Sequence, residues 1–435
     1  MEPVVVIGAG LAGCEAAWQI SKGGGKVILY EMKPLSYSPA HHSPCFAEIV
    51  CSNSFKSESL ENGPGVLKGE MELLDSLILR IAKETRVPAG DSLAVDREAF
   101  SEGITQTLEK LENVEIVRKE VSAIPQDGMT ILATGPLTSE ALSREIQRIT
   151  GDHRLFFYDA ISPIVTADSI NFGKVFKASR YGKGGDDYVN CPMDEETYYR
   201  FVDALNQAEK VPIRDFERRY LFEGCLPIEE LAARGKETLA FGPLKPVGLI
   251  DPKTGKQAFA VVQLRQENRF KTLFNLVGFQ TRLKYEEQKR VFRMIPGLEG
   301  AEFIRLGSVH RNLFVDSPRL LEESLQLKHR PHLFLAGQIT GVEGYMESAA
   351  MGLLAGINAF RKERGMEPVV PPPTTAIGAL IHYITHSQTV PFQPMNIHMG
   401  LFAPLPGKIR GREKRRLLAK RALKEMEKWI KEVEG

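Results

Sequence analysis

Hydrophobic residues form short, unbroken runs at residues 4–7, 27–30, 131–133 and 333–336. Runs of Val, Ile, Leu and Phe without alternation are typical of strands that are buried on both faces of a parallel sheet. Residues 11–20, between the first two runs, are rich in alanine and predict a helix. This order of strand, helix and strand predicts an α/β fold built on a parallel sheet.

The first predicted strand leads into a turn that contains Gly8, Gly10 and Gly13. In this G-x-G-x-x-G pattern the first glycine permits a tight turn, the second lets a pyrophosphate approach the backbone, and the third lets helix and strand pack closely. The second strand ends at Glu31, about 20 residues further on, where a carboxylate binds ribose hydroxyls. The segment therefore predicts a dinucleotide site at the N-terminus of the helix.

Two later segments indicate a larger dinucleotide. Residues 130–135 form an apolar strand that ends in Thr134 and Gly135, and small residues there let the backbone pass close to a cofactor. Residues 332–338 predict another strand that ends at glycine, and residues 347–360 predict a helix of small residues. NAD binding needs only the first strand–helix–strand unit, so these elements in this order favour FAD.

The middle of the chain is less regular. We expect residues 151–300 to form a smaller inserted α+β domain with soft boundaries, which divides the FAD-binding domain into residues 1–150 and 301–435. Within the insertion, residues 195–207 have the spacing of a helix. Before the insertion, the same spacing predicts a single helix over residues 69–85.

The bulk composition is that of an ordinary globular protein, with 43% hydrophobic and 26% charged residues and a net charge of +1. This balance excludes a general electrostatic attraction to nucleic acid. The chain has five cysteines and no C-x-x-C pair, which argues against a disulfide framework or a zinc site. No apolar run reaches the length of a membrane span. We therefore expect a cytoplasmic protein that binds neither metal nor membrane.

The last stretch of the chain is locally basic. Residues 408–431 hold eleven Lys and Arg residues against three Glu residues, in an amphipathic pattern. Such a stripe is either a solvated helix face or a phosphate-binding surface. Its occurrence in a nearly neutral chain favours phosphate binding.

Seven segments resemble the TrmFO family, the folate- and FAD-dependent tRNA uridine-5-methyltransferases of bacteria. They are GAGLAGCEAA (8–17), CSNSFKS (51–57), ILATGPLTS (131–139), FEGCLP (222–227), GSVHRN (307–312), LFLAGQITGVEGYMESAAMGLLAG (333–356) and FQPMNIHMGL (392–401). The glycine-rich segment occurs in many flavoproteins, whereas CSNS, GCLP, HRN and GQITGVEGY are far more specific. The resemblance spans nearly the whole chain and implies a Rossmann-like FAD-binding domain of the glutathione-reductase/GidA type.

The resemblance also implies the reaction. 5,10-Methylenetetrahydrofolate would supply a one-carbon unit to carbon-5 of a uridine in the T loop of tRNA. Reduced FAD would supply the electrons that turn methylene into methyl, and NADH or NADPH would reduce the flavin again. The product would be 5-methyluridine. Because the target base is stacked in folded tRNA, we expect the enzyme to extrude it.

This chemistry requires a thiolate. Carbon-5 of uracil is a poor nucleophile until a thiolate adds to carbon-6 and places carbanion character on carbon-5. By resemblance, Cys225 is this nucleophile and Cys51 is a second active-site cysteine. Cys51 either removes the carbon-5 proton or handles the one-carbon unit on the flavin. Cys14, Cys45 and Cys191 are expected to be ordinary small hydrophobic residues.

The other site residues follow from the same resemblance. His310 and Tyr345 are expected to bind folate, with a structural histidine and a core tyrosine as the alternatives. Arg97 is expected near the FAD phosphates or adenine, or else in a surface salt bridge. The expected cofactor-binding residues are Gly8, Ala9, Gly10, Leu11, Ala12, Gly13, Glu31, Arg97, Val121, Thr134, Gly135, Gly337, Gln338, Gly344 and Tyr345. The expected tRNA-binding residues are Arg412, Lys414, Arg415 and Arg416.

Two alternatives stay open at this point. One is another flavoenzyme, either GidA-like and acting on the wobble uridine or acting on a small substrate, which the chain length and the CSNS and GCLP segments oppose. The other is an FAD-containing tRNA-binding factor. Substitution of Cys225 distinguishes the latter, because a binding factor keeps its role with serine at that position.

Overall fold

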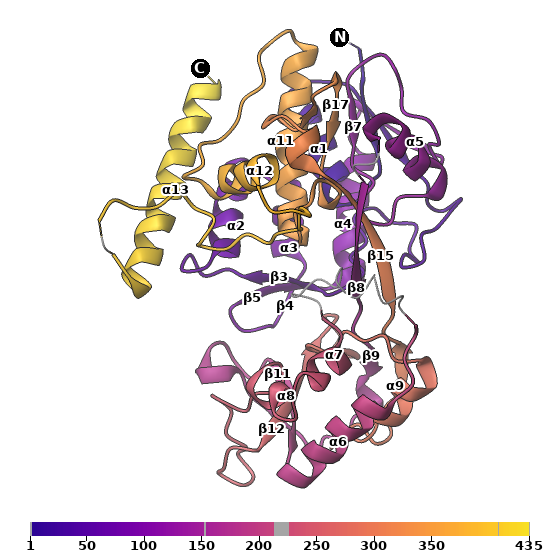
Figure 1. Ribbon diagram of the computed structural model, residues 1–435, viewed down its shortest axis with the longest axis vertical. Helices are drawn as coiled ribbons and strands as arrows, with labels where there is room; N and C mark the ends of the chain where they lie inside the picture. Colours follow the sequence, from indigo (N-terminus) through magenta and orange to yellow (C-terminus); the bar gives the residue numbers. More distant parts are fainter. Residues whose placement is uncertain (1, 152–153, 213–225, 408, 435) are drawn as a thin grey trace.

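A six-stranded sheet lies at the centre of the larger portion of the molecule (Figure 1), in the order β16-β17-β7-β1-β2-β6. The computed structural model describes residues 2–151, 154–212, 226–407 and 409–434. The strands of this sheet are β1 (Val4–Ile7), β2 (Val27–Glu31), β6 (Val114–Arg118), β7 (Thr130–Leu132), β16 (Gln326–Leu327) and β17 (Arg330–Leu335). All neighbours are parallel except β16 and β17. The predicted α/β fold with a parallel sheet is confirmed.

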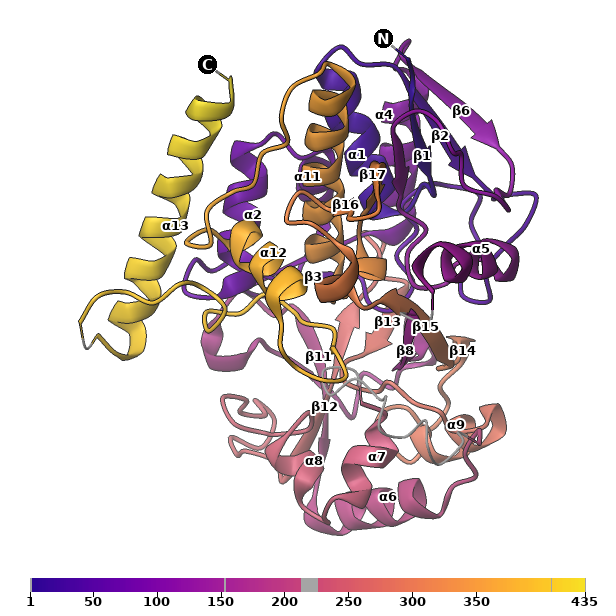
Figure 2. The ribbon, with the colours of Figure 1, turned by 45° about the horizontal axis from the view of Figure 1, so that its top comes forward.

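Helix α1 (Leu11–Lys22) packs directly against helix α11 (Tyr345–Glu363), and the two lie side by side in Figures 1 and 2. A Cβ atom on Gly352 would lie 2.0 Å from the carbonyl oxygen of Ala12, and one on Gly356 would lie 2.7 Å from that of Ala16. The small residues of both helices therefore allow a backbone-to-backbone approach. This contact joins the start of the chain to its last third.

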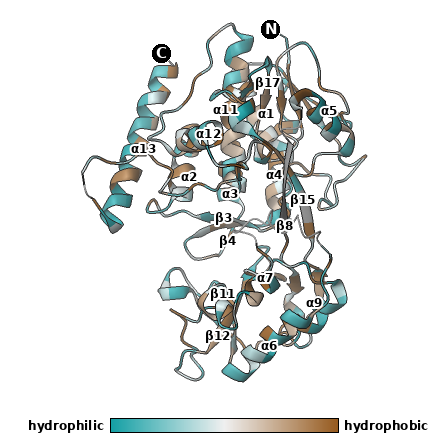
Figure 3. Cartoon of the chain, in the orientation of Figure 1, coloured by the Kyte–Doolittle hydropathy of each residue, from teal (hydrophilic) through white to brown (hydrophobic). Residues whose placement is uncertain are grey.

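Further helices cover the sheet and extend the larger portion outward. They are α2 (Gly63–Leu73), α3 (Leu77–Glu84), α4 (Arg97–Glu109), α5 (Glu140–Thr150), α10 (Ser317–Leu320), α12 (Ala376–His386) and α13 (Gly411–Glu434). Helix α13 buries Leu418, Ala422 and Met426 and packs on α2. Hydrophilic residues are prominent on α13 and on the other outer helices in Figure 3.

The prediction of one helix over residues 69–85 is wrong, because α2 ends and α3 begins within it. Asp75 has a left-handed backbone (φ +54°), and the Ser76 hydroxyl caps α3 by accepting from the Leu79 N–H. The buried Glu15 carboxylate accepts from the Ser76 hydroxyl at 2.7 Å and from the Ile78 N–H at 3.0 Å. A tertiary contact from α1 thus fixes a helix start that the apolar spacing does not reveal.

A second sheet is antiparallel and has the order β10-β11-β12-β13-β9-β14. Its strands are β9 (Ile164–Thr166), β10 (Phe176–Lys177), β11 (Tyr188–Met193), β12 (Ala260–Gln266), β13 (Leu273–Leu276) and β14 (Phe303–Arg305). The helices around it are α6 (Glu195–Gln207), α7 (Ile228–Ala233), α8 (Thr238–Phe241) and α9 (Tyr285–Phe292). The helix predicted at residues 195–207 is confirmed. This sheet has its own hydrophobic core around Tyr198, Phe201, Phe279 and Phe292.

Two short sheets connect the two larger ones (Figure 1). The paired strands β8 (Arg154–Ala160) and β15 (Val309–Val315) lead into and out of the second sheet. Strands β3 (Ser54–Ser57), β4 (Arg86–Val87) and β5 (Ser92–Val95) form the other. Short 3-10 turns occur at Ala167–Ser169, Arg180–Gly182 and Gln338–Thr340. The strands β9 to β13 fall within the predicted insertion, whereas β14 lies just beyond residue 300. The domain boundaries stay a prediction.

The described residues contain no helix that is both long and apolar enough to cross a bilayer. Among them, Cys14, Cys45, Cys51 and Cys191 are free thiols. Burial raises the pKa of the Cys14 and Cys191 thiols. These two cysteines therefore stay protonated and suit the structural role expected for them.

Replacement of Gly352 by alanine tests the contact between α1 and α11. The new methyl group meets the Ala12 backbone, which cannot turn away as a side chain can. We expect Gly352→Ala to lower the free energy of unfolding by about 1–3 kcal/mol, the usual range for overpacking, although alanine is the better helix former. Gly300→Ala is the control, since the nearest atom to its Cβ lies 3.9 Å away. Equal thermal stability of the two variants would contradict this expectation.

Candidate active site

A cleft of about 660 Å³ lies at the carboxyl ends of the parallel strands. Four neighbouring strands each place residues there, and ligands of open α/β sheets bind at this edge. Of the expected cofactor-binding residues, those that line it are Gly8, Ala9, Gly10, Glu31, Val121 and Thr134. The structure thus brings together residues from both halves of the first 150 positions.

The glycine-rich turn has the geometry that a pyrophosphate requires. Gly8 has φ +101°, and a Cβ there would lie 2.7 Å from the Ala133 carbonyl oxygen. Gly10 precedes α1, no side chain caps this helix end, and a Cβ on Gly10 would meet no protein atom within 4 Å. Gly13 lies against Gly8, whose carbonyl oxygen would be 1.8 Å from a Cβ on Gly13. The positive end of α1 therefore faces the cleft without obstruction.

The Glu31 carboxylate is held in place by two backbone amides at the end of β2. Oε2 accepts from the Ala9 N–H at 3.0 Å, and Oε1 accepts from the Lys33 N–H at 2.9 Å. Lys33 itself is buried, and its ammonium donates to the Cys45 carbonyl at 2.6 Å. Burial and the charge of Lys33 lower the pKa of His41, another cleft residue, to about 4. His41 is therefore uncharged at neutral pH.

A second cavity of about 1140 Å³ meets the first at Leu137, which lines both. Cys51, Gln338, Gly344 and Tyr345 are the expected site residues on its wall. The two spaces are adjacent, so a single extended ligand can occupy both.

Tyr345 fixes the backbone of the Cys51 segment. Its hydroxyl oxygen accepts from the Cys51 N–H at 2.7 Å and from the Ser52 N–H at 3.3 Å. The ring packs edge-on against Phe55, with centroids 5.7 Å apart. Burial and the neighbouring Cys51 raise the pKa of Tyr345. The phenol therefore keeps its proton at neutral pH and has it available to donate.

Buried polar contacts tie the Cys51 segment to the second sheet. Arg265 on β12 donates from Nε to the Asn53 side-chain oxygen at 2.8 Å, and its NH2 group donates to the Ser52 hydroxyl at 2.7 Å. Asn53 in turn donates to the carbonyls of Val95 and Gln266, each at 2.9 Å. These bonds fix Cys51 between the two large sheets of the molecule.

Arg97 is a second link between the two large sheets. Its Nε lies 2.5 Å from a carboxylate oxygen of Glu267, and its NH1 group donates to the Ile49 carbonyl at 2.6 Å. The Glu267 side chain is only 2% exposed. Arg97, Arg265 and Arg305 all lie within electrostatic reach of Cys51.

Lys56 has a strained backbone on the wall of the second cavity. Its φ is +63°, which is rare for a residue with a side chain. Its ammonium lies 3.0 Å from the buried Glu347 carboxylate, which also accepts from the Ile397 N–H at 3.2 Å. Strain of this kind is found at functional sites, where the surrounding contacts maintain it.

Comparison with known proteins identifies the family. Residues 3–367 match the family described as Glucose inhibited division protein A. A Geobacter sulfurreducens protein named methylenetetrahydrofolate–tRNA-(uracil-5-)-methyltransferase TrmFO is 60% identical over 431 residues, 99% of each chain. The chain belongs to the TrmFO family. A Sulfurihydrogenibium protein of the same name is 58% identical over 433 residues, again 99% of each.

The solved structure of Aquifex aeolicus GidA (form II crystal) is similar with a TM-score of 0.72 and 19% identity. The match covers 99% of this chain and 76% of that one. At this identity the likeness concerns the fold, and it confirms the predicted GidA-type architecture. The much higher identity to TrmFO relatives favours that family over the GidA-like alternative.

Several residues expected from the TrmFO resemblance lie outside the cavity walls. Leu11, Ala12 and Gly13 form the first turn of α1. Gly337 (φ +83°) packs against Ala12, and Gly135 (φ +66°) follows Thr134. Arg97 lines neither cavity. Its ion pair with Glu267 is buried, so the alternative of a surface salt bridge is wrong. These positions shape the site, and their contact with a cofactor stays a prediction.

Two expected residues cannot be placed within the site of this TrmFO-family chain. Cys225 lies outside the described residues. His310 is on β15, in register with Asp159 of β8, and its side chain is outside what the structure describes. The pairing of Cys51 with Cys225 therefore stays a prediction.

The expected tRNA-binding residues of the TrmFO-family tail are all exposed near the start of α13. Arg412 and Arg416 both pair with Glu61, at 2.6 and 2.9 Å. The hydrogen bond from Arg412 lowers the pKa of the Glu61 carboxyl. Glu61 offsets some of the basic charge, while Lys414 and Arg415 add to it. None of these four basic residues lines either cavity.

Sequence reasoning missed the residues that position Cys51 in this TrmFO-family chain. Asn53 lies inside the CSNS segment, which served only as a family motif and predicted no structural role for this residue. Arg265 and Glu267 occur where the buried strand β12 turns from apolar to polar residues, a change that signals a functional strand end. Both residues are far from Cys51 along the chain, so no local sequence pattern indicates that they position its segment.

Removal of the Arg97 charge tests the buried link. We expect Arg97→Met to lower the free energy of unfolding by about 3–5 kcal/mol, because Glu267 is then buried without a partner. Lys83→Met is the control, since Lys83 pairs with Glu72 on the exposed surface, where such a pair contributes about 0–1 kcal/mol. Chemical denaturation of both variants measures the difference. Similar small losses in both would contradict the buried link.

Proposed function

We propose that this chain methylates carbon-5 of the T-loop uridine of tRNA to 5-methyluridine, with 5,10-methylenetetrahydrofolate as the carbon donor. The observation that carries the proposal is the position of Cys51, on the wall of a cavity that adjoins a dinucleotide cleft. Relatives with 58–60% identity over nearly the whole chain bear the name of this methyltransferase. Both observations support the same chemistry.

FAD fits the two spaces, with its ADP moiety in the first and its isoalloxazine ring in the second. The turn at residues 8–13 leaves room for the pyrophosphate, and the anchored Glu31 carboxylate would accept from the ribose hydroxyls. Gln338, Gly344 and Tyr345 would lie around the ring. When bound and reduced by NADH or NADPH, FAD supplies the electrons that convert methylene to methyl.

The protein side of the chemistry falls to two cysteines. The Cys225 thiolate would form a bond to carbon-6 of the uracil, which makes carbon-5 nucleophilic toward the methylene carbon. Loss of the carbon-5 proton and cleavage of the bond between the methylene carbon and the folate nitrogen then release tetrahydrofolate. After reduction of the methylene to methyl, departure of the Cys225 thiolate restores the double bond between carbon-5 and carbon-6. Cys51 would accept that proton or handle the one-carbon unit.

We assign the folate to the second cavity, beside the flavin ring. Tyr345 has a phenol proton to donate there, since its oxygen already accepts two backbone amides. His310 is the other residue proposed for folate. Lys56 adds a positive charge on the same wall, which suits the anionic tail of a folate.

We assign tRNA binding to the start of α13, where Arg412, Lys414, Arg415 and Arg416 are exposed. Phosphate contacts of this kind position a nucleic acid without reading its bases. The target uridine must leave its stack to reach the second cavity, where Cys51 lies, at a cost of a few kcal/mol. A tRNA substrate also places the reaction in the cytoplasm.

Nucleoside analysis tests the reaction directly. T-loop-unmodified tRNA is incubated with the FAD-loaded protein, methylenetetrahydrofolate and NADPH. We expect 5-methyluridine from the wild type, and at least an about 100-fold slower rate from Cys51→Ser and Cys225→Ser, since nucleophile substitutions have effects of this size or larger. Cys45→Ser is the matched control, because Cys45 lines neither cavity. A folded, yellow wild-type protein that forms no 5-methyluridine would overturn the proposal.

Salt dependence of tRNA binding tests the role of the tail. We expect Lys414→Ala/Arg415→Ala to weaken binding and to reduce the slope of log K against log salt by about 0.7–0.9 for each lost phosphate contact. Lys26→Ala/Lys110→Ala removes the same charge from exposed positions outside α13 and serves as the control. An unchanged slope in the tail variant would show that α13 does not contact the tRNA backbone.

A further inference from the structure

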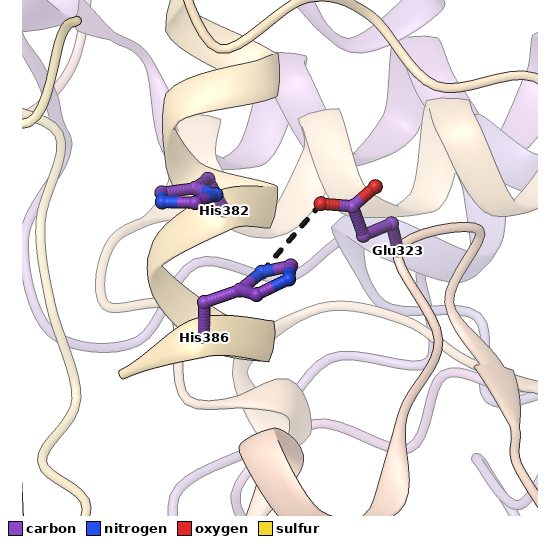
Figure 4. A group of neighbouring side chains, drawn as sticks. All are labelled: Glu323, His382 and His386. Atoms are coloured by element: carbon purple, nitrogen blue, oxygen red, sulfur yellow. Dashed lines mark ion pairs between the residues drawn. The ribbon is translucent and has the colours of Figure 1, made fainter. Parts of the chain in front are cut away.

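Three metal-ligating side chains meet away from both cavities: Glu323, His382 and His386 (Figure 4). Glu323 lies between α10 and β16, and both histidines lie on α12. One ligand atom from each residue lies within 4.8 Å of the others. The cluster thus joins two segments that are far apart in the sequence.

The two histidines are four residues apart and share one face of α12. Their rings stack with centroids 4.6 Å apart and an interplanar angle of 21°. This i, i+4 spacing is the one by which a helix presents two imidazoles to a single zinc ion. Imidazole nitrogen is also the ligand that zinc, copper and nickel prefer over calcium and magnesium.

Glu323 is already near the position of a third ligand. Its Oε1 lies 3.5 Å from Nδ1 of His386. Two ligands of one tetrahedral zinc lie about 3.4 Å apart, given metal–ligand bonds of about 2.0–2.1 Å. This pair therefore needs almost no movement, and His382 needs only a rotation of an exposed side chain. The Glu323 and His386 side chains are 46% and 51% exposed, so an ion can enter from solvent.

The hydrogen bonds of His386 indicate what a metal would displace. The Thr385 hydroxyl donates to the Ile381 carbonyl at 2.7 Å, and its oxygen lies 2.9 Å from Nδ1 of His386. Since that hydroxyl proton is used, Nδ1 carries the proton that Thr385 and Glu323 share. Metal binding at Nδ1 requires the other tautomer, with the proton on Nε2, because histidine binds a metal through an unprotonated ring nitrogen.

The end of α12 also favours a cation. His386 is the last residue of the helix, where the backbone carbonyls carry partial negative charge. At the other end of α12, the buried Glu70 carboxylate accepts from the Ala376 and Ile377 amides at 2.6 and 2.9 Å. A metal ion at His386 would hold the second end of the same helix.

We propose that Glu323, His382 and His386 form a surface site for zinc or a similar divalent transition metal, with water as the fourth ligand. The site is structural: it ties α12 to the segment after α10, and none of its residues lines the cavities. The chain has no C-x-x-C pair, and the sequence therefore predicted no zinc site. Two histidines and one glutamate on separate segments form no compact motif, so the sequence pattern does not reveal this cluster.

Calorimetric titration of the metal-stripped, FAD-loaded full-length protein with Zn²⁺ tests the site. We expect one binding event whose Kd weakens at least tenfold in His386→Gln and in Glu323→Gln. His329→Gln is the matched control, since His329 is exposed and outside the cluster, and we expect it to bind Zn²⁺ as the wild type does. Zn²⁺ should raise the Tm of the wild type and of His329→Gln only, because an ion stabilises the state that binds it.

Two results would overturn the proposal. One is a wild-type protein that binds no Zn²⁺, and the other is a set of binding events that all persist in both cluster variants, as binding by thiols would. Equal Tm values in EDTA show that the variants fold. Should His386→Gln fail this check, Glu323→Gln decides alone, since that residue is in an exposed segment. A Mg²⁺ titration with the same affinity would overturn the assigned class of metal.

Discussion

The backbone-to-backbone contact between α1 and α11 is the constraint on which the rest of the structure depends. Gly352 and Gly356 lie so close to the carbonyl oxygens of Ala12 and Ala16 that neither position has room for a Cβ atom. The contact holds Gly337 against Ala12 and fixes the start of α11, so that the second cavity is lined by residues from the first and last thirds of the chain.

A second constraint acts from the other sheet. Arg265 holds Ser52 and Asn53, while Glu267 binds Arg97. Buried ion pairs contribute little net stability compared with apolar packing, and their value here is positional. They place the Cys51 thiol at the junction of the two sheets, with three arginines around it. The chemistry of this cysteine thus depends on residues more than two hundred positions away.

The basic residues of the molecule form two groups with different roles, one inside the site and one on an outer helix. A nearly neutral chain concentrates arginines around a thiol and lysines and arginines on an outer helix. The inner group acts through buried hydrogen bonds and a buried ion pair that position the Cys51 segment. The outer group acts through solvent, where salt screens it. Glu61, which pairs with Arg412 and Arg416, moderates the outer group in the absence of a polyanion.

The sequence alone determined the parallel sheet, the glycine-rich turn with Glu31 and the basic helix, because each depends on residues that are close together in the chain. It also pointed to Cys51 and Tyr345 through the family motifs. Only the tertiary structure decided the break at Asp75, the buried role of Arg97, the link from Arg265 to Asn53 and the meeting of Glu323 with His386. The physical reason is that periodicity reports which face of an element is buried, whereas buried polar partners are chosen by distance in space.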